Sequence, residues 1–202
     1  MPSTESVHYF DRQFRRQVEA GDFLLNPFET SALPHLRGRV LDFGCGLGNL
    51  AVAAARQGCE VVALDASPAA IAHLRDVAVR ETLPIVAIEA DLRDYAIGGA
   101  FDAAVCIGLL MFFDCATAER QLAALQSCVR PGGVMALNVL AQGTTYVDMF
   151  DAAAGYCLWP PAAVLERFRG WELLHVAEQD FPAPGDRLKR FVTVVARKPA
   201  GG

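Results

Sequence analysis

Residues 40–50 read VLDFGCGLGNL, an apolar run that leads into three glycines at alternate positions. The apolar run predicts a buried strand, and the alanine-rich residues that follow it predict a helix. Because glycine has no Cβ, a turn made of glycines lets a ligand approach the backbone closely. Such a turn between a strand and a helix N-terminus is typical of sites that bind nucleotides and related molecules.

The spacing of the glycines separates two classes of nucleotide-like ligand. Gly44, Gly46 and Gly48 give the pattern G-x-G-x-G, whereas the dinucleotide fingerprint is G-x-G-x-x-G. Asp42 lies just before the turn, where a carboxylate would repel a pyrophosphate. The same carboxylate would tolerate an ammonium group or orient it through water. The turn therefore favours a ligand with a cationic group over a dinucleotide.

The pattern of the whole chain predicts an α/β fold. We expect helices over residues 7–21, 27–36, 47–57, 69–80, 116–129 and 161–168. We expect strands over residues 39–43, 60–64, 85–89, 101–107, 134–140, 171–178 and 190–196, with a turn at 130–133 and a loop at 179–186. This alternation predicts a doubly wound, mostly parallel sheet with helices on both faces. No helix fits between the last two strands, so they are expected to form an antiparallel hairpin.

Polar residues or glycines follow four of the predicted parallel strands, at Gly44, Asp65, Asp91 and Gly108. Ligands of doubly wound sheets bind at this carboxyl edge, so the four positions are expected to share one site. The carboxylate of Asp65 suits the two hydroxyls of a ribose. Its alternative role, as the cap of the next helix, is better filled by Ser67, which precedes a proline.

The Asp91-Leu92 pair suits the recognition of an adenine ring. The carboxylate can accept a hydrogen bond from the exocyclic amine, and the N–H of Leu92 can reach a ring nitrogen. Dinucleotide folds have no such need at this strand end. The pair, taken with Asp65, predicts a ligand that contains an adenosyl group.

Composition limits the classes of partner. The 202 residues carry a net charge of -5, which argues against a nucleic-acid partner, and the densest basic cluster fits a solvated helix face. The longest apolar run, residues 103–113, is too short to cross a membrane, and the first residues show no signal peptide. We therefore expect a cytoplasmic protein with a small-molecule substrate, no nucleic-acid or membrane partner, and a monomeric or homodimeric state.

The six cysteines lie at positions 45, 59, 106, 115, 128 and 157, without C-x-x-C or zinc-finger spacing. We expect buried free thiols in a reducing compartment and no metal site. Cys45 lies inside the glycine turn, where its backbone N–H alone can contribute to a site.

Five motifs together resemble the motif series of class I S-adenosylmethionine-dependent methyltransferases. They are VLDFGCGLGN (40–49), ALDAS (63–67), EADLRDY (89–95), FDAAVCIGLLMFF (101–113) and VRPGGVM (129–135). The resemblance implies strand order 3-2-1-4-5-7-6 with strand 7 antiparallel. It also implies S-adenosylmethionine as the cofactor and S-adenosylhomocysteine as its product. The expected cofactor-binding residues are Tyr9, Asp42, Gly44, Cys45, Gly46, Asp65, Ala66, Asp91, Leu92, Ile107 and Gly108.

A narrower set of motifs is similar to the tellurite-resistance (TehB-type) methyltransferases. These are LLMFFD (109–114), the PGG turn, RFRGWELL (167–174), RFVTVVARK (190–198) and a Tyr9-Phe10 pair. This resemblance implies methylation of tellurite, selenite or a related small nucleophile. The family carries a His-Arg pair before its last strand, but residues 179–186 contain no histidine here. We therefore expect a soft or anionic substrate, with Arg190 as the candidate catalytic residue; a solvated arginine is the alternative.

The expected organisation is a single methyltransferase domain over residues 1–202. Residues 1–38 are expected to form a helical lid in which Tyr9 covers the cofactor carboxylate, unless Tyr9 is a core aromatic. Residues 39–140 are the cofactor-binding core, and 141–202 the substrate side and the hairpin. A soft nucleophile needs little help from a general base, and no histidine stands out as one. Two other functions stay open: a non-catalytic adenosyl-binding protein and a nicotinamide oxidoreductase.

Overall fold

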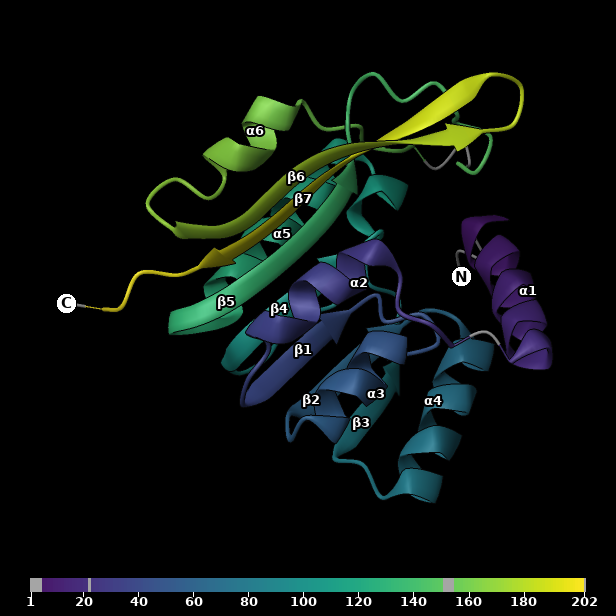
Figure 1. Cartoon of the computed structure of the whole chain (residues 1–202), viewed down its shortest axis with the longest axis vertical. Coiled ribbons are helices and arrows are strands. Elements are labelled where there is room, and N and C mark those ends of the chain that lie inside the picture. Colours follow the sequence, from purple (N-terminus) through teal and green to yellow (C-terminus); the bar gives the residue numbers. More distant parts are fainter. Residues whose placement is uncertain (1–4, 22, 151–154, 202) are drawn as a thin grey trace.

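The computed structural model describes residues 5–21, 23–150 and 155–201. For residues 5–9 it describes the backbone but not the side chains. Its strands are β1 (Arg39–Phe43), β2 (Glu60–Asp65), β3 (Ile85–Glu89), β4 (Phe101–Ile107), β5 (Val129–Leu140), β6 (Glu172–Ala183) and β7 (Arg187–Arg197). They form one seven-stranded sheet in the order β3-β2-β1-β4-β5-β7-β6 (Figure 1). β7 pairs antiparallel with both β5 and β6, and the other pairs are parallel. The predicted fold class and strand order are confirmed.

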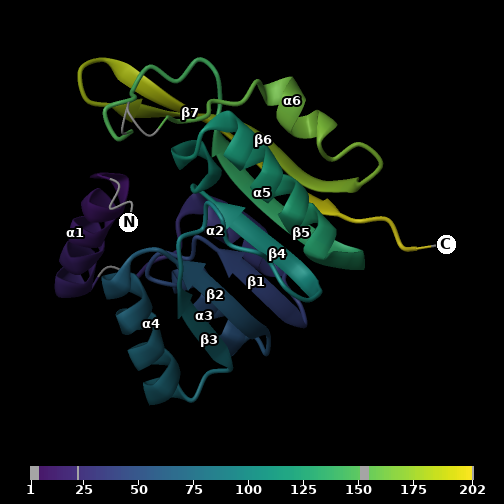
Figure 2. The ribbon, with the colours of Figure 1, turned by 180° about the vertical axis from the view of Figure 1, so that it is seen from behind.

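Helices cover both faces of the sheet. They are α1 (Glu5–Ala20), α2 (Pro27–Ala32), α3 (Asn49–Arg56), α4 (Pro68–Glu81), α5 (Cys115–Cys128) and α6 (Pro161–Glu166), with short 3-10 helices η1 (Leu33–His35) and η2 (Leu110–Phe112). In Figure 1 α2 and α3 lie in front of the strands and α4 lies beside β3, and the view from behind in Figure 2 brings α5 and α6 forward. Residues of α4 share one core with those of α3. Each face therefore has its own helical layer.

Alternating side chains of the central strands fill a separate core on each face. In β1, Val40 belongs to the core under α3 and α4, while Leu41 belongs to the core under α5. The side chains of β4 are almost wholly buried, which explains its continuous apolar sequence, since parallel strands are covered on both sides. Burial of both faces fixes the register, because a slip of one residue would exchange the two cores.

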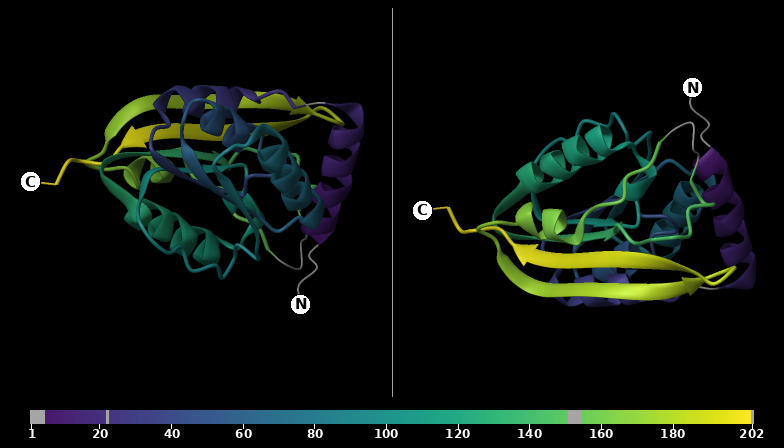
Figure 3. Two further views of the ribbon diagram at one scale, coloured as in Figure 1. Left: turned by 90° about the horizontal axis from the view of Figure 1, so that it is seen from below. Right: turned by 90° about the horizontal axis from the view of Figure 1, so that it is seen from above.

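Helix α1 lies outside these two layers. Figure 3 shows it crossing the end of the molecule toward which the parallel strands point. It packs on α4, where Asp11 accepts hydrogen bonds from the Ser67 hydroxyl at 2.7 Å and the Ala69 N–H at 3.2 Å. These bonds from Ser67 and Ala69, with one from Arg15, outweigh partial burial and lower the pKa of Asp11. An ionised Asp11 thus holds α1 against the N-terminus of α4, which favours negative charge.

Two predicted connections are strands in the structure. Residues 130–133, expected as a turn, lie inside β5 as an irregularity: Val129 pairs with Phe101 and Val134 with Ala103. Gly132 there has a φ of +77° and its N–H donates to the Lys198 carbonyl, so the glycines form a bulge rather than a chain reversal. Residues 179–183, expected in a loop, continue β6 because they pair with β7 up to Ala183 opposite Arg187.

The expectation of free thiols is wrong for two of the six cysteines. Cys115, the first residue of α5, forms a disulfide with Cys157, and the other four are buried and free. Sequence spacing does not reveal the pair, because 42 positions separate its members. Disulfides are typical of oxidising compartments, so this bond is evidence against the expected reducing compartment. Among the described residues, no helix combines the length and the apolar character that crossing a membrane requires.

Substitutions at two glycines with positive φ, Gly48 and Gly58, test how tightly α3 packs on α4. A Cβ on Gly48 would lie 2.5 Å from the Leu74 side chain, whereas a Cβ on Gly58 would meet nothing within 4 Å. We expect Gly58→Ala to lower the free energy of unfolding by about 1 kcal/mol through backbone strain alone. Gly48→Ala should lower it by about 2–4 kcal/mol, because Leu74 must also move. Urea denaturation of both variants measures the difference, and equal losses would contradict this packing.

Candidate functional site

A pocket of about 350 Å³ opens at the carboxyl ends of β1, β2 and β4, under α1. Ligand sites of small molecules commonly have volumes of a few hundred Å³. It is lined by ten of the eleven predicted cofactor-binding residues: Asp42, Gly44, Cys45, Gly46, Asp65, Ala66, Asp91, Leu92, Ile107 and Gly108. Tyr9, the eleventh, lies in α1, and its side chain is outside the described residues. The structure thus brings together residues that lie up to 66 positions apart in the chain, from Asp42 to Gly108.

Because its glycines have no side chains, the backbone of the glycine turn packs directly against neighbouring residues. A Cβ on Gly44 would lie 2.9 Å from Leu109, and one on Gly46 would lie 3.1 Å from the Phe14 ring of α1. The N–H of Cys45, expected to serve the site, donates instead to the Leu64 carbonyl at 2.9 Å. The β1–β2 pairing continues beyond Phe43, and this bond fixes where the turn begins.

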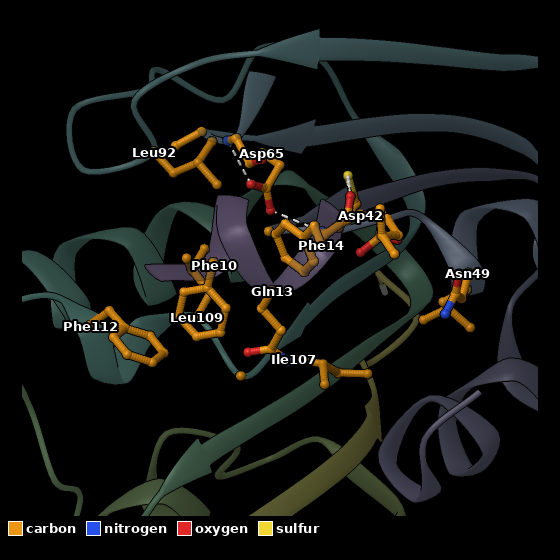
Figure 4. Close-up of a pocket in the computed structure, with 18 of the residues that line it drawn as sticks. Phe10, Gln13, Phe14, Asp42, Asn49, Asp65, Leu92, Ile107, Leu109 and Phe112 are labelled. Atoms are coloured by element: carbon orange, nitrogen blue, oxygen red, sulfur yellow. Dashed lines mark hydrogen bonds between the residues drawn. The ribbon is translucent and has the colours of Figure 1, made fainter. Parts of the chain in front are cut away.

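Asp65 joins the second strand end to the glycine turn. Its carboxylate accepts hydrogen bonds from the N–H of Gly46 and of Ser67, each at 2.9 Å. Ser67 caps α4 by accepting from the Ala70 N–H, as expected, so Asp65 is not needed for that role. Burial raises the pKa of Asp65, and the backbone hydrogen bonds act in the opposite direction. In Figure 4 its oxygens lie between Leu92 and Phe14, inside the pocket.

Asp91 and Leu92 line the pocket beyond the third strand. The Asp91 carboxylate accepts from Nε and Nη2 of Arg93 at 3.0 and 2.9 Å, and these hydrogen bonds hold its pKa below the usual value. Arg93, which the sequence did not single out, also lines the pocket and neutralises this acid. Leu92 is buried and offers an apolar surface that an adenine ring can contact.

Asp42 is the least satisfied polar group of the site. Its side chain is 5% exposed, and its Oδ2 atom has no hydrogen-bond partner in the described structure. Burial, then the charges of Glu29 and Asp65, raise the pKa of Asp42 to about 8. A buried carboxylate without a partner is costly and requires a donor from elsewhere. An ammonium group, as in the amino-acid tail of S-adenosylmethionine, supplies both donors and charge, so the residues present fit that cofactor.

Several lining residues were not predicted from the sequence. They come from α1 and from the segment before β1, and they are Phe10, Gln13, Phe14, Gln17, Leu24, Asn26 and Glu29. Figure 4 shows Phe10 beside Leu109 and Phe112, and the rings of Phe10 and Phe112 meet edge to face at 5.0 Å. Asn26 and Glu29 could be recognised in the sequence only as the start of a helix, because Asn followed three residues later by Glu is typical of a helix N-terminus.

Arg190, the candidate catalytic residue, is not among the residues that line this pocket. It faces Asp180 across the β6–β7 pair, and its guanidinium donates two hydrogen bonds to that carboxylate at 2.8 and 2.7 Å. Hydrogen bonds from Arg190 lower the pKa of Asp180. Because the predicted loop is a strand here, Asp180 lies opposite Arg190 and pairs with it. An anion would have to compete with Asp180 for this arginine.

Comparison with known proteins places these features in a wider group. Residues 40–133 match the family model of a methyltransferase domain. "Hemagglutinin 1" of Eikenella corrodens is 30% identical over 173 residues, which cover 80% of this chain and 55% of that protein. The chain spans about half the length of the curated relatives it matches.

Solved structures share the fold at low sequence identity. TehB from Haemophilus influenzae superposes with a TM-score of 0.77 at 19% identity, over 90% of this chain and 65% of TehB. The N-methyltransferase NodS from Bradyrhizobium japonicum, solved with S-adenosylhomocysteine, gives 0.67 at 16% identity, over 94% and 98%. The motif series, strand order and matching domain agree, and S-adenosylmethionine is the cofactor that the site fits. The fold is therefore that of the class I S-adenosylmethionine-dependent methyltransferases, with the architecture of TehB, and residues 40–133 match a methyltransferase domain.

Proposed function

We propose that this protein transfers a methyl group from S-adenosylmethionine to a small soft nucleophile. The observation that carries the proposal is the unsatisfied Asp42 carboxylate in the same pocket as Asp65 and the Asp91-Leu92 pair. These groups match the ammonium, the ribose and the adenine of one molecule. In this proposal the segment before β1 forms the lid, residues 39–140 bind the cofactor, and the remainder forms the acceptor side.

The residues of the chain act mainly by positioning. When bound, S-adenosylmethionine supplies an electrophilic methyl group on a positively charged sulfur. Asp65 accepts from the ribose hydroxyls, Leu92 contacts the adenine, and Asp42 accepts from the ammonium group. Helix α1 covers the pocket through Phe10 and Phe14 and excludes water. Holding the acceptor about 3–3.5 Å from the methyl carbon, in line with sulfur, then supplies most of the rate enhancement.

The walls left for the acceptor are apolar and aromatic. Phe10, Leu109 and Phe112 lie together in Figure 4, and Phe112 is backed by the ring of Phe150 at 5.1 Å. Arg93 is the one cationic side chain among the described lining residues, and Asp91 already pairs with it. Tellurite and selenite are soft but anionic, and an anion gains little from these walls. We therefore rank a small thiol ahead of either oxyanion, because a thiol enters the pocket uncharged and releases its proton to solvent only as it becomes the thiolate that attacks the methyl carbon.

Replacing Asp65 tests the cofactor site. We expect the wild-type protein to bind S-adenosylhomocysteine with a dissociation constant on the order of micromolar. Asp65→Asn should weaken binding at least tenfold, because the ribose loses a charged acceptor, about 1.4 kcal/mol or more. Asp76→Asn, at an exposed position of α4, is the control and should bind as the wild type does. Isothermal calorimetry measures all three, and no binding by the wild type would contradict the proposal.

The raised pKa of Asp42 predicts a dependence of cofactor affinity on pH. Burial and the neighbouring acids Glu29 and Asp65 keep Asp42 protonated below a pKa of about 8, while an ammonium ligand requires the ionised form. Affinity for S-adenosylhomocysteine should therefore rise between pH 6 and 8, by up to about tenfold per unit, and then level off. Cys45 and Cys106 also face Asp42, but burial raises their thiol pKa values, so they stay neutral in this range.

Asp42→Asn is the matched variant for this pH dependence. This variant should bind S-adenosylhomocysteine more weakly than the wild type at pH 8, and its affinity should not change with pH. Without ligand, the folded protein keeps the Asp42 proton up to about pH 8, whereas the unfolded chain loses it at about pH 4. The free energy of unfolding should therefore fall as pH rises from about 4 toward 8. The variant should therefore be more stable than the wild type at pH 8 by about 1–3 kcal/mol. Urea denaturation and calorimetry at pH 6, 7 and 8 measure both effects, and a pH-independent wild-type affinity would disprove the assignment.

The choice of acceptor is tested with a panel of small thiols, amines, selenite and tellurite. We expect radiolabelled methyl transfer to a thiol and no increase in tellurite tolerance when a sensitive bacterium expresses the protein. A higher tolerance that disappears with Asp65→Asn would reverse the ranking in favour of the oxyanion. Cofactor binding without transfer to any member of the panel would favour a non-catalytic adenosyl-binding protein instead.

A further inference from the structure

Helix α2 brings a second carboxylate to the pocket. Glu29 is half-buried, lines the pocket with Asp42, and lies close enough to raise the pKa of Asp42 through its charge. Its own pKa is raised by burial. Glu29 lies before β1 and outside residues 40–133, which match the methyltransferase domain. The motif series therefore does not account for it.

A capping box fixes the orientation of Glu29. The Asn26 side chain accepts from the N–H groups of Phe28 and Glu29, and Glu29 Oε2 accepts from the Asn26 N–H at 2.8 Å. The cap needs only one of the two carboxylate oxygens. Among the described residues, none donates a hydrogen bond to the other oxygen, Oε1. The cap thus holds Glu29 in place and leaves one oxygen for another partner.

Glu29 and Asp42 form a pair of acids for which the described part of the chain supplies no cation. Oδ2 of Asp42 is fully buried without a partner, and the described lining offers only Arg93, which binds Asp91. A buried carboxylate beside a second, half-buried one is unfavourable in its ionised form unless a cation lies between them. The described residues include no group of three or more His, Cys, Asp and Glu side chains suited to a metal ion. An organic cation that donates hydrogen bonds fits the pair better.

We propose that Glu29 and Asp42 together bind the α-ammonium group in the amino-acid tail of the cofactor, so that Glu29 helps to select adenosyl ligands that carry this tail. The inference rests on the proposed function. A primary ammonium carries three N–H donors, enough for two carboxylates, whereas the sulfonium has none. Glu29 is thus a specificity residue on the lid side of the pocket, and it does not touch the methyl group.

The capping box permits a variant that removes the charge and keeps the helix. Glutamine can accept from the Asn26 N–H as glutamate does, so Glu29→Gln should leave α2 intact. Two probes separate the roles: S-adenosylhomocysteine carries the ammonium tail, and 5′-methylthioadenosine has the same adenosine and sulfur without it. Calorimetry is done with the wild type, Glu29→Gln, Asp42→Asn, the double variant and the control Glu60→Gln, at an exposed residue of β2.

We expect Glu29→Gln to weaken S-adenosylhomocysteine binding at least fivefold and to change 5′-methylthioadenosine binding less than twofold. The effect should shrink when Asp42 is already asparagine, because the two acids share one cation. An unchanged affinity for S-adenosylhomocysteine, or equal losses for both ligands, would show that Glu29 serves only the helix cap. A wild type that binds neither probe would refute the proposed function itself, and this inference with it.

Discussion

The parallel pairing of β1 with β2 on one side and β4 on the other is the constraint on which the site depends. It brings three strand ends to one edge, and the β1–β2 register continues into the turn through the bond from Cys45 N–H to the Leu64 carbonyl. That bond places Gly46 beside Asp65, whose carboxylate accepts its N–H. The glycine turn and the acid of the next strand thus form one unit before any ligand is present.

The arrangement of charge around this unit is the basis of the selectivity that we propose for the pocket. Asp91 has Arg93 as its partner and Asp65 has backbone N–H donors, whereas Asp42 and Glu29 have no cation from the described chain. Acids that already accept hydrogen bonds within the chain suit neutral groups such as hydroxyls and an adenine edge. In our proposal a cationic ligand stabilises the ionised form of the second pair, which the described residues leave without a counter-ion. Sites of this kind reduce stability in the free protein in favour of binding.

Much of the fold and of the candidate site was predictable, because both depend on local patterns. Buried strands read as apolar runs, and Gly44, Asp65 and Asp91 follow those runs directly, so the sheet topology was enough to bring them together. Features that depend on distant pairs were not predictable. The pairing of Asp180 with Arg190 required the strand that replaced an expected loop, and the contact of Phe10 with Phe112 required the position of α1.

The same limit applies to the segment before β1. Its capping box was visible as Asn26 and Glu29, but the sequence does not show that this short helix brings a carboxylate into the pocket that Asp42 lines. Local sequence signals show where a helix begins, whereas tertiary packing determines which side of that helix lies toward the pocket. In α2 the packing includes Phe28, whose ring contacts Phe181 and Phe191 of the hairpin. The hairpin thereby helps to position a residue of the candidate site.

The disulfide between Cys115 and Cys157 has a practical consequence for handling the protein. It joins the start of α5 to the segment before α6, so α5 and β5 lie within one covalently closed ring of the chain. A protease that cuts once inside this ring leaves the two fragments linked, and they separate on a gel only after reduction. An apparently intact band under non-reducing conditions is therefore not evidence of an uncut chain.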